Sequence, residues 1–166
     1  DNYLTNPIDR IQNIDYNNKK FSFYNNDSYS IDHIFKNNNI DVILHFAALV
    51  GNSESMRKPI DYINNNITFT VLLLEKAREY EIKRFIFSSS STVYGSNSRL
   101  YNTEDDLTSP NSIYGITKKT CEDLIQLYGY NYNIETIILR YYNIFANTKY
   151  YHYKPVIPLL TEKIIN

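Results

Sequence analysis

A tyrosine and a lysine four residues apart, Tyr114 and Lys118, are the residues of this 166-residue chain best suited to proton transfer. On a helix this spacing places both side chains on one face. A phenol with a pKa near ~10 is a poor base at neutral pH, and a neighbouring ammonium favours the phenolate. The spacing alone is weak evidence, because the chain has 17 tyrosines and Tyr16 and Lys20 repeat it in a polar stretch.

A run of serines, Ser88 to Ser91, precedes this pair and follows a short apolar run. Taken alone, such a run is equally typical of a turn. Hydroxyls that end one strand, followed by a Tyr/Lys pair that begins the next helix, would meet at the ligand-binding edge of a parallel sheet. The order of the two motifs therefore favours a site that handles protons.

Three apolar runs of strand length supply the elements that position these groups. Each is rich in β-branched or aromatic residues and does not alternate apolar with polar residues. Continuous apolarity is typical of strands buried on both faces, which indicates a parallel sheet. The runs are Asp41–Ala47, Arg84–Ser88 and Glu135–Tyr142, and Phe21–Tyr24 is a weaker candidate.

Helical patterns separate these runs. We expect helices over Ser30–Phe35, over Pro59–Tyr80 with the proline in the first turn, and over Ser112–Tyr128 with Gly129 as the stop. The order β-α-β-α-β-α-β predicts an α/β fold with a right-handed, doubly wound parallel sheet of the Rossmann-like kind. Such sheets bind ligands beyond the carboxyl ends of their strands.

Other residues near the predicted strand ends are given structural or binding roles. The small residues Ala47 and Ala48 allow a planar ligand to approach the backbone, and Asn143 is placed to hydrogen-bond a polar ligand. We expect His45 to be a core residue and Arg140 to form a structural ion pair. Cys121 is also expected in the core. His33 and His152 have no partners at metal-ligand spacing, so no metal site is predicted.

The overall composition excludes several classes of protein. The 17 basic and 18 acidic residues nearly cancel, so nothing indicates binding to nucleic acid or to an anionic membrane. The sequence contains no apolar run of membrane-spanning length and no signal pattern at its start. The single cysteine is compatible with a reducing compartment. These facts predict a soluble cytoplasmic protein.

Taken together, these stretches resemble the extended short-chain dehydrogenase/reductase family of NAD-dependent epimerases and dehydratases, and within it the UDP-glucose 4-epimerases. Several ordered motifs with compatible gaps are far more specific than any one of them. The motifs are His45–Ala48, Lys58-Pro59 with Asn64–Asn66, Phe87–Ser90 with Thr92–Gly95, Tyr114-x-x-x-Lys118 and Leu139–Asn143.

The resemblance implies a role for each residue of the site. Tyr114 would take the proton from the sugar 4-hydroxyl while a hydride passes from C4 to NAD. Lys118 would bind the nicotinamide ribose and lower the pKa of Tyr114, and Ser90 would hydrogen-bond the 4-oxygen. A 4-keto sugar would turn over in the pocket and regain the hydride on its other face, which interconverts UDP-glucose and UDP-galactose.

The resemblance also implies the binding residues. Substrate contacts would come from Ser90, Tyr114 and Asn143. Cofactor contacts would come from Asp1, Asn2, Phe46, Ala47, Ala48, Asn65, Ser90, Tyr114, Lys118 and Tyr142. In Asp1-Asn2 we recognise the acidic end of the family's second strand, which favours NAD over NADP. Val50 departs from the family, which often has a cofactor-contacting lysine at this position.

On this interpretation residues 1–166 are part of an NAD-binding domain. Its first strand and glycine-rich turn are missing, and the C-terminal substrate-binding part is mostly absent. The isolated chain is expected neither to bind NAD tightly nor to turn over, because the pyrophosphate would lack its helix N-terminus. Members of the family are commonly homodimers, so the full-length protein is a candidate homodimer.

Two alternatives remain open. Sister dehydratases and decarboxylases need acidic residues just before the Val-Tyr-Gly segment, where this chain has Ser91 and Thr92. Hydroxyls cannot do acid/base work near neutrality, which disfavours both sister reactions. A non-catalytic NAD-binding regulator is the other alternative, although such a protein need not keep the hydroxyl of Tyr114.

Overall fold

The computed structural model describes residues 19–24, 30–96 and 101–144. Tertiary contacts divide the chain into two units. The first comprises Asp1–Asn26 and Tyr142–Asn166, and the second is Asp27–Tyr141. The second unit contains α1 (Asp32–Asn37), β1 (Val42–His45), α2 (Asn52–Arg57), α3 (Pro59–Tyr62), the π-helical turn η2 (Ile63–Thr68), α4 (Phe69–Glu79), β2 (Arg84–Ser90), the 3₁₀ turn η3 (Ser91–Tyr94), α5 (Ile113–Tyr132) and β3 (Glu135–Tyr141).

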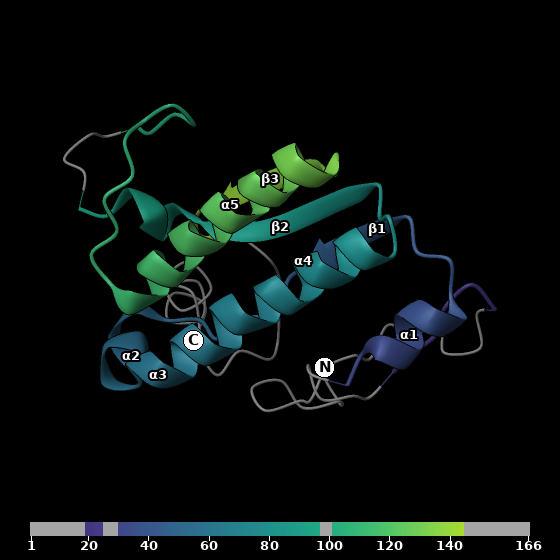
Figure 1. Ribbon diagram of the computed structural model, residues 1–166. Helices are drawn as coiled ribbons and strands as arrows, with labels where there is room; N and C mark the ends of the chain where they lie inside the picture. The colour runs from purple at the N-terminus through teal and green to yellow at the C-terminus, as the bar shows by residue number, and fades with distance from the viewer. Residues whose placement is uncertain (1–18, 25–29, 97–100, 145–166) are drawn as a thin grey trace, which may run out of the picture. The chain divides into compact units, whose positions relative to one another are not determined.

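The three strands form a parallel sheet in the order β1-β2-β3. His45 at the end of β1 pairs with Phe87, and Ser90 at the end of β2 pairs with Tyr141. The carboxyl ends of all three strands therefore point the same way, as Figure 1 shows. The predicted α/β class and the three strong strands are confirmed, with β2 extending two residues beyond the predicted end so that it includes Ser90.

Helices α4 and α5 lie side by side across one face of this sheet (Figure 1). The core beneath them contains Phe85 and Phe87 of β2, which are almost fully buried, together with Leu74 of α4 and Ile125 of α5. The other face of β1 is open within the described residues, and Leu44 is 61% exposed. For this strand, burial on both faces is therefore not found among the described residues, because α4 and α5 both return on the same side.

The weaker strand predicted at Phe21–Tyr24 is not formed. These residues have no regular secondary structure. A strand exists only where its backbone pairs with a neighbour, and among the described residues the three sheet strands pair only with one another. A four-residue apolar run is too short to predict such pairing.

The predicted helix over Pro59–Tyr80 is present, but it is not uniformly α-helical. Pro59 occupies the first turn as predicted. The middle of the helix, η2, has π-helical hydrogen bonding and connects α3 to α4. Turns of this kind are rare and often occur at functional sites. Side-chain periodicity gave no sign of it.

The end of α5 differs from the prediction at Gly129. The helix continues to Tyr132 and stops at Asn133, which adopts the left-handed conformation with φ of 54°. Asparagine is one of the few residues that tolerate this region. Gly129 instead allows close packing against the next strand, because a Cβ at this position would lie 2.8 Å from the Thr136 methyl carbon and 3.0 Å from the Ile134 oxygen.

Helix α1 lies two residues later than the predicted Ser30–Phe35. It packs against α4 through the rings of Phe35 and Tyr80, whose centroids are 5.5 Å apart. Lys76 forms an ion pair with Asp32 at 2.8 Å across the same contact. These contacts place α1 in the helical layer next to α4.

Candidate active site

The predicted catalytic residues meet where β2 ends and α5 begins. Lys118 is 3% exposed, and its Nζ donates to the Ser88 carbonyl oxygen at 2.7 Å. The same ammonium lies 4.7 Å from the centroid of the Phe87 ring, a cation–π distance. Burial lowers the pKa of Lys118 to about 8. The lysine is therefore held in one position and can lose its charge at mildly alkaline pH.

Tyr114 is buried one turn before Lys118, and its phenol lies close to the Ser90 side chain. Burial raises the pKa of the Tyr114 phenol, and the neighbouring Ser90 side chain opposes this rise. The expected lowering by Lys118 is not found. The reason is that the ammonium lies 5.9 Å from the ring centroid and is directed to the Ser88 carbonyl, so removal from water dominates.

Helix α2, which was not predicted, fixes the first turn of α5. The backbone N–H of Tyr114 donates to Ser55 Oγ at 3.0 Å, and the Ser55 hydroxyl donates to the Asn52 carbonyl at 2.6 Å. The N-cap residue Ser112 accepts from Gly115 N and donates to Asn52 Oδ1, both at 3.0 Å. The run from Asn52 to Ser55 has no apolar periodicity, so only its helix-capping residue types could have indicated this role.

The residue after Tyr114 explains how closely η3 and α5 approach. A Cβ on Gly115 would lie 2.9 Å from the Thr92 carbonyl oxygen and 3.0 Å from Pro110 Cβ. A side chain of any size would push the turn after Ser90 away from the start of α5. Glycine at this position therefore keeps the turn after Ser90 close to the start of α5.

The asparagine that organises the nearby loop is Asn66, whereas the motif indicated its neighbour Asn65. The Asn66 side chain accepts from Leu49 N at 2.8 Å, donates to Leu49 O at 3.0 Å, and donates to Thr117 Oγ1 at 3.1 Å. Asn65 is half-buried and donates to Asn66 Oδ1 at 3.1 Å. The π-helical turn thus ties the loop after β1 to α5, and the predicted cofactor contact of Asn65 stays a prediction.

His45 is a core residue, as predicted. Its Nε2 lies 2.8 Å from Thr70 Oγ1, and its ring packs edge-on against Phe69. Burial lowers the pKa of His45 to about 3, so the ring is neutral at physiological pH. The predicted core position of Cys121 is also confirmed.

The residues just beyond β1 contrast with this burial. Phe46 and Ala47 are exposed and Ala48 is half-buried. These positions leave the loop accessible at the edge of the sheet where Ser90 lies.

Arg140 forms the structural ion pair that was predicted for it. Its partner is Glu122 on α5, and the guanidinium Nη2 lies 2.9 Å from Glu122 Oε2. This contact raises the pKa of Arg140, since the hydrogen bond to the carboxylate favours the charged form. The sequence pattern does not mark Glu122 as this partner, because a glutamate within a helix is most often exposed.

The structure does not test four of the predicted site residues. Asp1 and Asn2 lie outside the described residues. Tyr142 and Asn143 belong to the first unit and are exposed there. Their predicted contacts with cofactor or substrate stay predictions.

The family model for the NAD dependent epimerase/dehydratase family matches residues 9–166. The chain belongs to this family. The predicted resemblance to extended short-chain dehydrogenases/reductases is thereby confirmed, and the cofactor of the family is NAD. Solved members also share the described α/β arrangement, which confirms the predicted Rossmann-like class.

Several members of the family are similar to this chain. A UDP-glucose 4-epimerase of Halalkalibacterium halodurans is 38% identical over 119 residues, which are 70% of this chain and 35% of that protein. The UDP-N-acetylglucosamine 4-epimerase of Methanobrevibacter ruminantium, solved with UDP-N-acetylmuramic acid, is 29% identical with a TM-score of 0.83. That match covers 93% of this chain and 51% of the solved one.

A third relative was solved with both a nucleotide sugar and NAD. It is the UDP-glucuronic acid 4-epimerase of Bacillus cereus, which is 37% identical with a TM-score of 0.67. The match covers 74% of this chain and 39% of that one. This chain therefore spans about a third to a half of the length of these three relatives.

The described residues fit one end of NAD, the nicotinamide and its ribose. Lys118 has three N–H donors, and Ser88 O accepts from its ammonium. Ala47, at the open edge beyond β1, has no side-chain atom larger than a methyl group to obstruct a planar ring. The described residues include no glycine-rich turn for the pyrophosphate.

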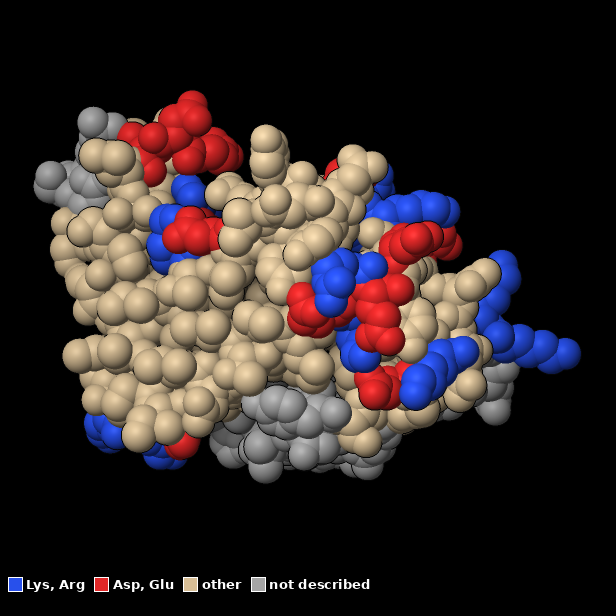
Figure 2. All heavy atoms as spheres, viewed as in Figure 1, with Lys and Arg blue, Asp and Glu red and all other residues tan. Residues whose placement is uncertain are grey.

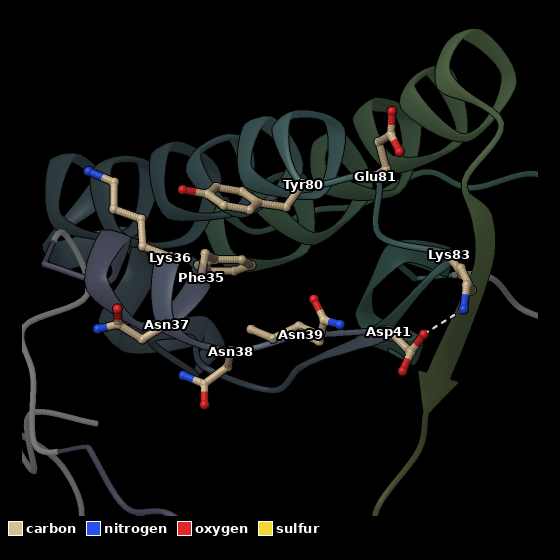
Figure 3. Close-up of a pocket in the computed structure, with 10 residues that line it drawn as sticks. Phe35, Lys36, Asn37, Asn38, Asn39, Asp41, Tyr80, Glu81 and Lys83 are labelled. Atoms are coloured by element: carbon tan, nitrogen blue, oxygen red, sulfur yellow. Dashed lines mark hydrogen bonds and ion pairs between the residues drawn. The ribbon is translucent and has the colours of Figure 1, made fainter.

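A separate depression of about 660 Å³ lies at the opposite edge of the sheet. Its residues precede β1 and β2, and Figure 3 shows Lys83 reaching across to Asp41, with the two charged atoms 2.6 Å apart. Most of its lining side chains are exposed and polar. This depression is not part of the site around Tyr114.

Charges of both signs are interleaved on the face shown in Figure 2. On α4, Arg78 pairs with Glu75 and Lys76 pairs with Glu79, both at 2.6 Å. The described helices include none long and apolar enough to cross a membrane. Within the same residues, no group of three or more potential ligands could hold a metal ion.

Proposed function

We propose that this chain is part of an NAD-dependent UDP-sugar 4-epimerase that interconverts UDP-glucose and UDP-galactose. The observation that carries the proposal is the closeness of the Tyr114 phenol to the Ser90 side chain, beside the buried ammonium of Lys118. The three relatives are all named as nucleotide-sugar 4-epimerases, which supports 4-epimerisation of a nucleotide sugar.

Tyr114 is the proposed acid and base. Its phenolic oxygen takes the proton of the sugar 4-hydroxyl and later returns it, and Ser90 hydrogen-bonds the same sugar oxygen. Bound NAD supplies the reversible hydride acceptor for C4 of the sugar. Since burial raises the pKa of Tyr114, the phenol is protonated at neutral pH in this structure and is ready to donate. Its action as a base requires stabilisation of the phenolate, for which Lys118 is the nearby cation.

The turn after Ser90 favours epimerisation over the sister reactions. Ser91 and Thr92 begin η3, and neither can ionise near neutral pH. Elimination of water or a decarboxylation of the family type would need an acidic group here. Thr92 Oγ1 is buried with no hydrogen-bond partner among the described residues.

The test is an assay of the full-length protein with UDP-galactose, UDP-N-acetylgalactosamine and UDP-glucuronate as separate substrates. We expect UDP-glucose to form from the first. Turnover of only one of the others would assign the same chemistry to another sugar, and failure with all three would reject the proposal. Activity retained in Tyr114→Phe would instead show that the phenolic hydroxyl is not the acid and base of the reaction.

We further propose that residues 1–166 form part of the NAD-binding domain and that the full-length protein is a homodimer. The share of each relative that this chain spans supports the first statement. Calorimetry of the isolated chain should detect no tight NAD binding, and light scattering of the full-length protein should give twice the monomer mass.

A further inference from the structure

Glu122 is a buried carboxylate that the proposed reaction does not use. It lies on α5 one turn beyond Lys118 and is 1% exposed. Its Oε1 accepts from Ser89 Oγ at 2.5 Å and from Arg140 Nε at 3.0 Å, and its Oε2 accepts from Arg140 Nη2 at 2.9 Å. A buried carboxylate is strongly unfavourable unless donors satisfy it. This one is fully engaged by a serine of β2 and an arginine of β3.

Three consecutive residues of β2 meet three residues of α5 that are four apart. Residues at this spacing lie on one face of a helix, so the end of the strand is attached to the helix over two turns. Two of the three contacts contain the proposed catalytic groups, and the third contains Glu122. The pairs are Ser90 with Tyr114, Ser88 with Lys118, and Ser89 with Glu122.

Arg140 extends this attachment to the turn that follows Ser90. Its Nη1 donates to the Tyr94 hydroxyl at 3.0 Å and to the Glu104 carbonyl at 3.1 Å. Its guanidinium also lies over the Tyr94 ring, 5.0 Å from the centroid. The pair therefore contacts both sides of Ser90. Glu122 binds Ser89, the residue before it, and Arg140 binds Tyr94 at the end of η3.

We propose that Glu122 and Arg140 are positioning residues that fix Ser90 relative to Tyr114 and Lys118. This inference rests on the proposed function, since it assigns a purpose to the pair within the same site. Neither residue needs to touch the sugar or the cofactor. Misplacement of catalytic groups by about 1 Å lowers a rate by on the order of 10²-fold. Loss of the Glu122–Arg140 pair should therefore lower the rate measurably, even though neither residue contacts the reacting atoms.

The pair also sets the electrostatic surroundings of Lys118. The titratable and charged groups that face Lys118 are His45 on β1, Tyr114, Cys121 and Glu122 on α5, and Arg140 behind Glu122 on β3. Burial lowers the pKa of Lys118, while Cys121 and Glu122 raise it. Removal of the Glu122 charge should therefore lower the pKa of Lys118 further, an effect that a purely structural contact would not have.

The experiment uses the full-length protein and the variants Glu122→Gln and Asp123→Asn. Asp123 is the matched control, because it is the adjacent acidic residue on α5, is exposed, and pairs with Lys119. In Glu122→Gln we expect kcat for UDP-galactose to fall by about 10- to 100-fold with little change in KM. The pH midpoint of Lys118, followed by NMR of ¹³C-labelled lysine, should move downward. Both quantities should be unchanged in Asp123→Asn.

A double variant separates positioning from stability. In Glu122→Leu/Arg140→Met both charges are replaced by apolar groups, which commonly preserves folding where a single change does not. We expect its thermal unfolding to stay cooperative while kcat stays low. Wild-type kcat in the double variant would overturn the proposal, as would an unchanged Lys118 midpoint or kcat in Glu122→Gln. If the wild type has no epimerase activity, the proposed function fails and the Lys118 midpoint alone decides the role of the pair.

Discussion

The backbone N–H of Tyr114 donates to the hydroxyl of Ser55, which belongs to a different helix. The first N–H groups of a helix have no acceptor within it, and here a buried serine of α2 provides one at 3.0 Å. The position of the proposed catalytic phenol therefore depends on a residue that never approaches its hydroxyl.

Substitution of Ser55 by alanine should weaken both stability and catalysis. Loss of a helix-capping acceptor is worth about 1 kcal/mol, and the released first turn of α5 should lower kcat more than it changes KM. Urea unfolding and steady-state kinetics of the full-length protein measure these effects. Ser53→Ala is the control, since Ser53 lies on the same helix and is exposed. Equal behaviour of the two variants would contradict the role given to Ser55.

Substitution of Tyr114 by phenylalanine should nearly abolish turnover. Removal of a general acid/base lowers rates by about 10²- to 10⁴-fold, and the ring itself keeps its contacts. The apolar replacement also removes a buried hydroxyl, so the melting temperature should change little. Tyr130→Phe on the same helix is the matched control, because Tyr130 is 89% exposed. Full activity in Tyr114→Phe would reject an acid/base role for the phenol.

The depressed pKa of Lys118 predicts opposite effects of pH on activity and stability. Its folded pKa of about 8 lies below its usual value of 10.5 because burial disfavours the charged form. Between these values the unfolded chain binds more protons than the folded one, so the contribution of Lys118 to stability rises with pH through this window. Activity should fall over the same range, because the ammonium beside Tyr114 is lost as the pH passes about 8.

Unfolding free energies and kcat measured from pH 7 to pH 10 test this prediction, with Lys118→Met as the comparison. The variant should lack the rise in stability that is specific to Lys118. A wild-type kcat that stays constant to pH 10 would show that the ammonium does not contribute to the reaction.

Replacement of Asn66 by alanine should detach the loop after β1. The amide of Asn66 satisfies both the N–H and the carbonyl of Leu49. A buried polar group left without its partner lowers the free energy of unfolding by about 1–3 kcal/mol. We expect a loss of stability of this size and faster hydrogen exchange at Leu49. Asn64→Ala, at an exposed position of the same π-helical turn, should have a much smaller effect. Similar losses in both variants would argue against the bridging role.

The strands and the main helices could be predicted because their sequence signals are local. Phe85–Phe87 is continuously apolar before the serines that follow, and Pro59 marks the start of a helix that has regular apolar spacing. Helix α2 could not be predicted, because its polar residues Asn52–Ser55 have no apolar periodicity and its position is set by contacts with α5. Local patterns report on elements that bury their own apolar face, whereas α2 is held by hydrogen bonds to a distant segment.

The site could be predicted in part for the same reason. Ser90, Tyr114 and Lys118 form an ordered motif, and the structure brings them together. Glu122 and Asn66 were not identified, since a glutamate on a helix usually faces solvent and an asparagine within an Asn run resembles a loop residue. Their burial depends on partners far away in the sequence, such as Arg140 for Glu122 and Leu49 for Asn66.

The π-helical turn η2 has a consequence for how this chain tolerates changes in length. A π turn accommodates one residue more than an α-turn, so η2 offsets α3 from α4 by about 100° of rotation, the angle that one α-helical residue contributes. Through that offset Tyr62 reaches the Val50 carbonyl and the ring of Tyr114, while Leu73 and Leu74 of α4 stay in the core. A one-residue deletion within Asn64–Asn66 would restore an ordinary helix and turn Tyr62 away from Tyr114, although every residue that contacts Tyr114 would still be present.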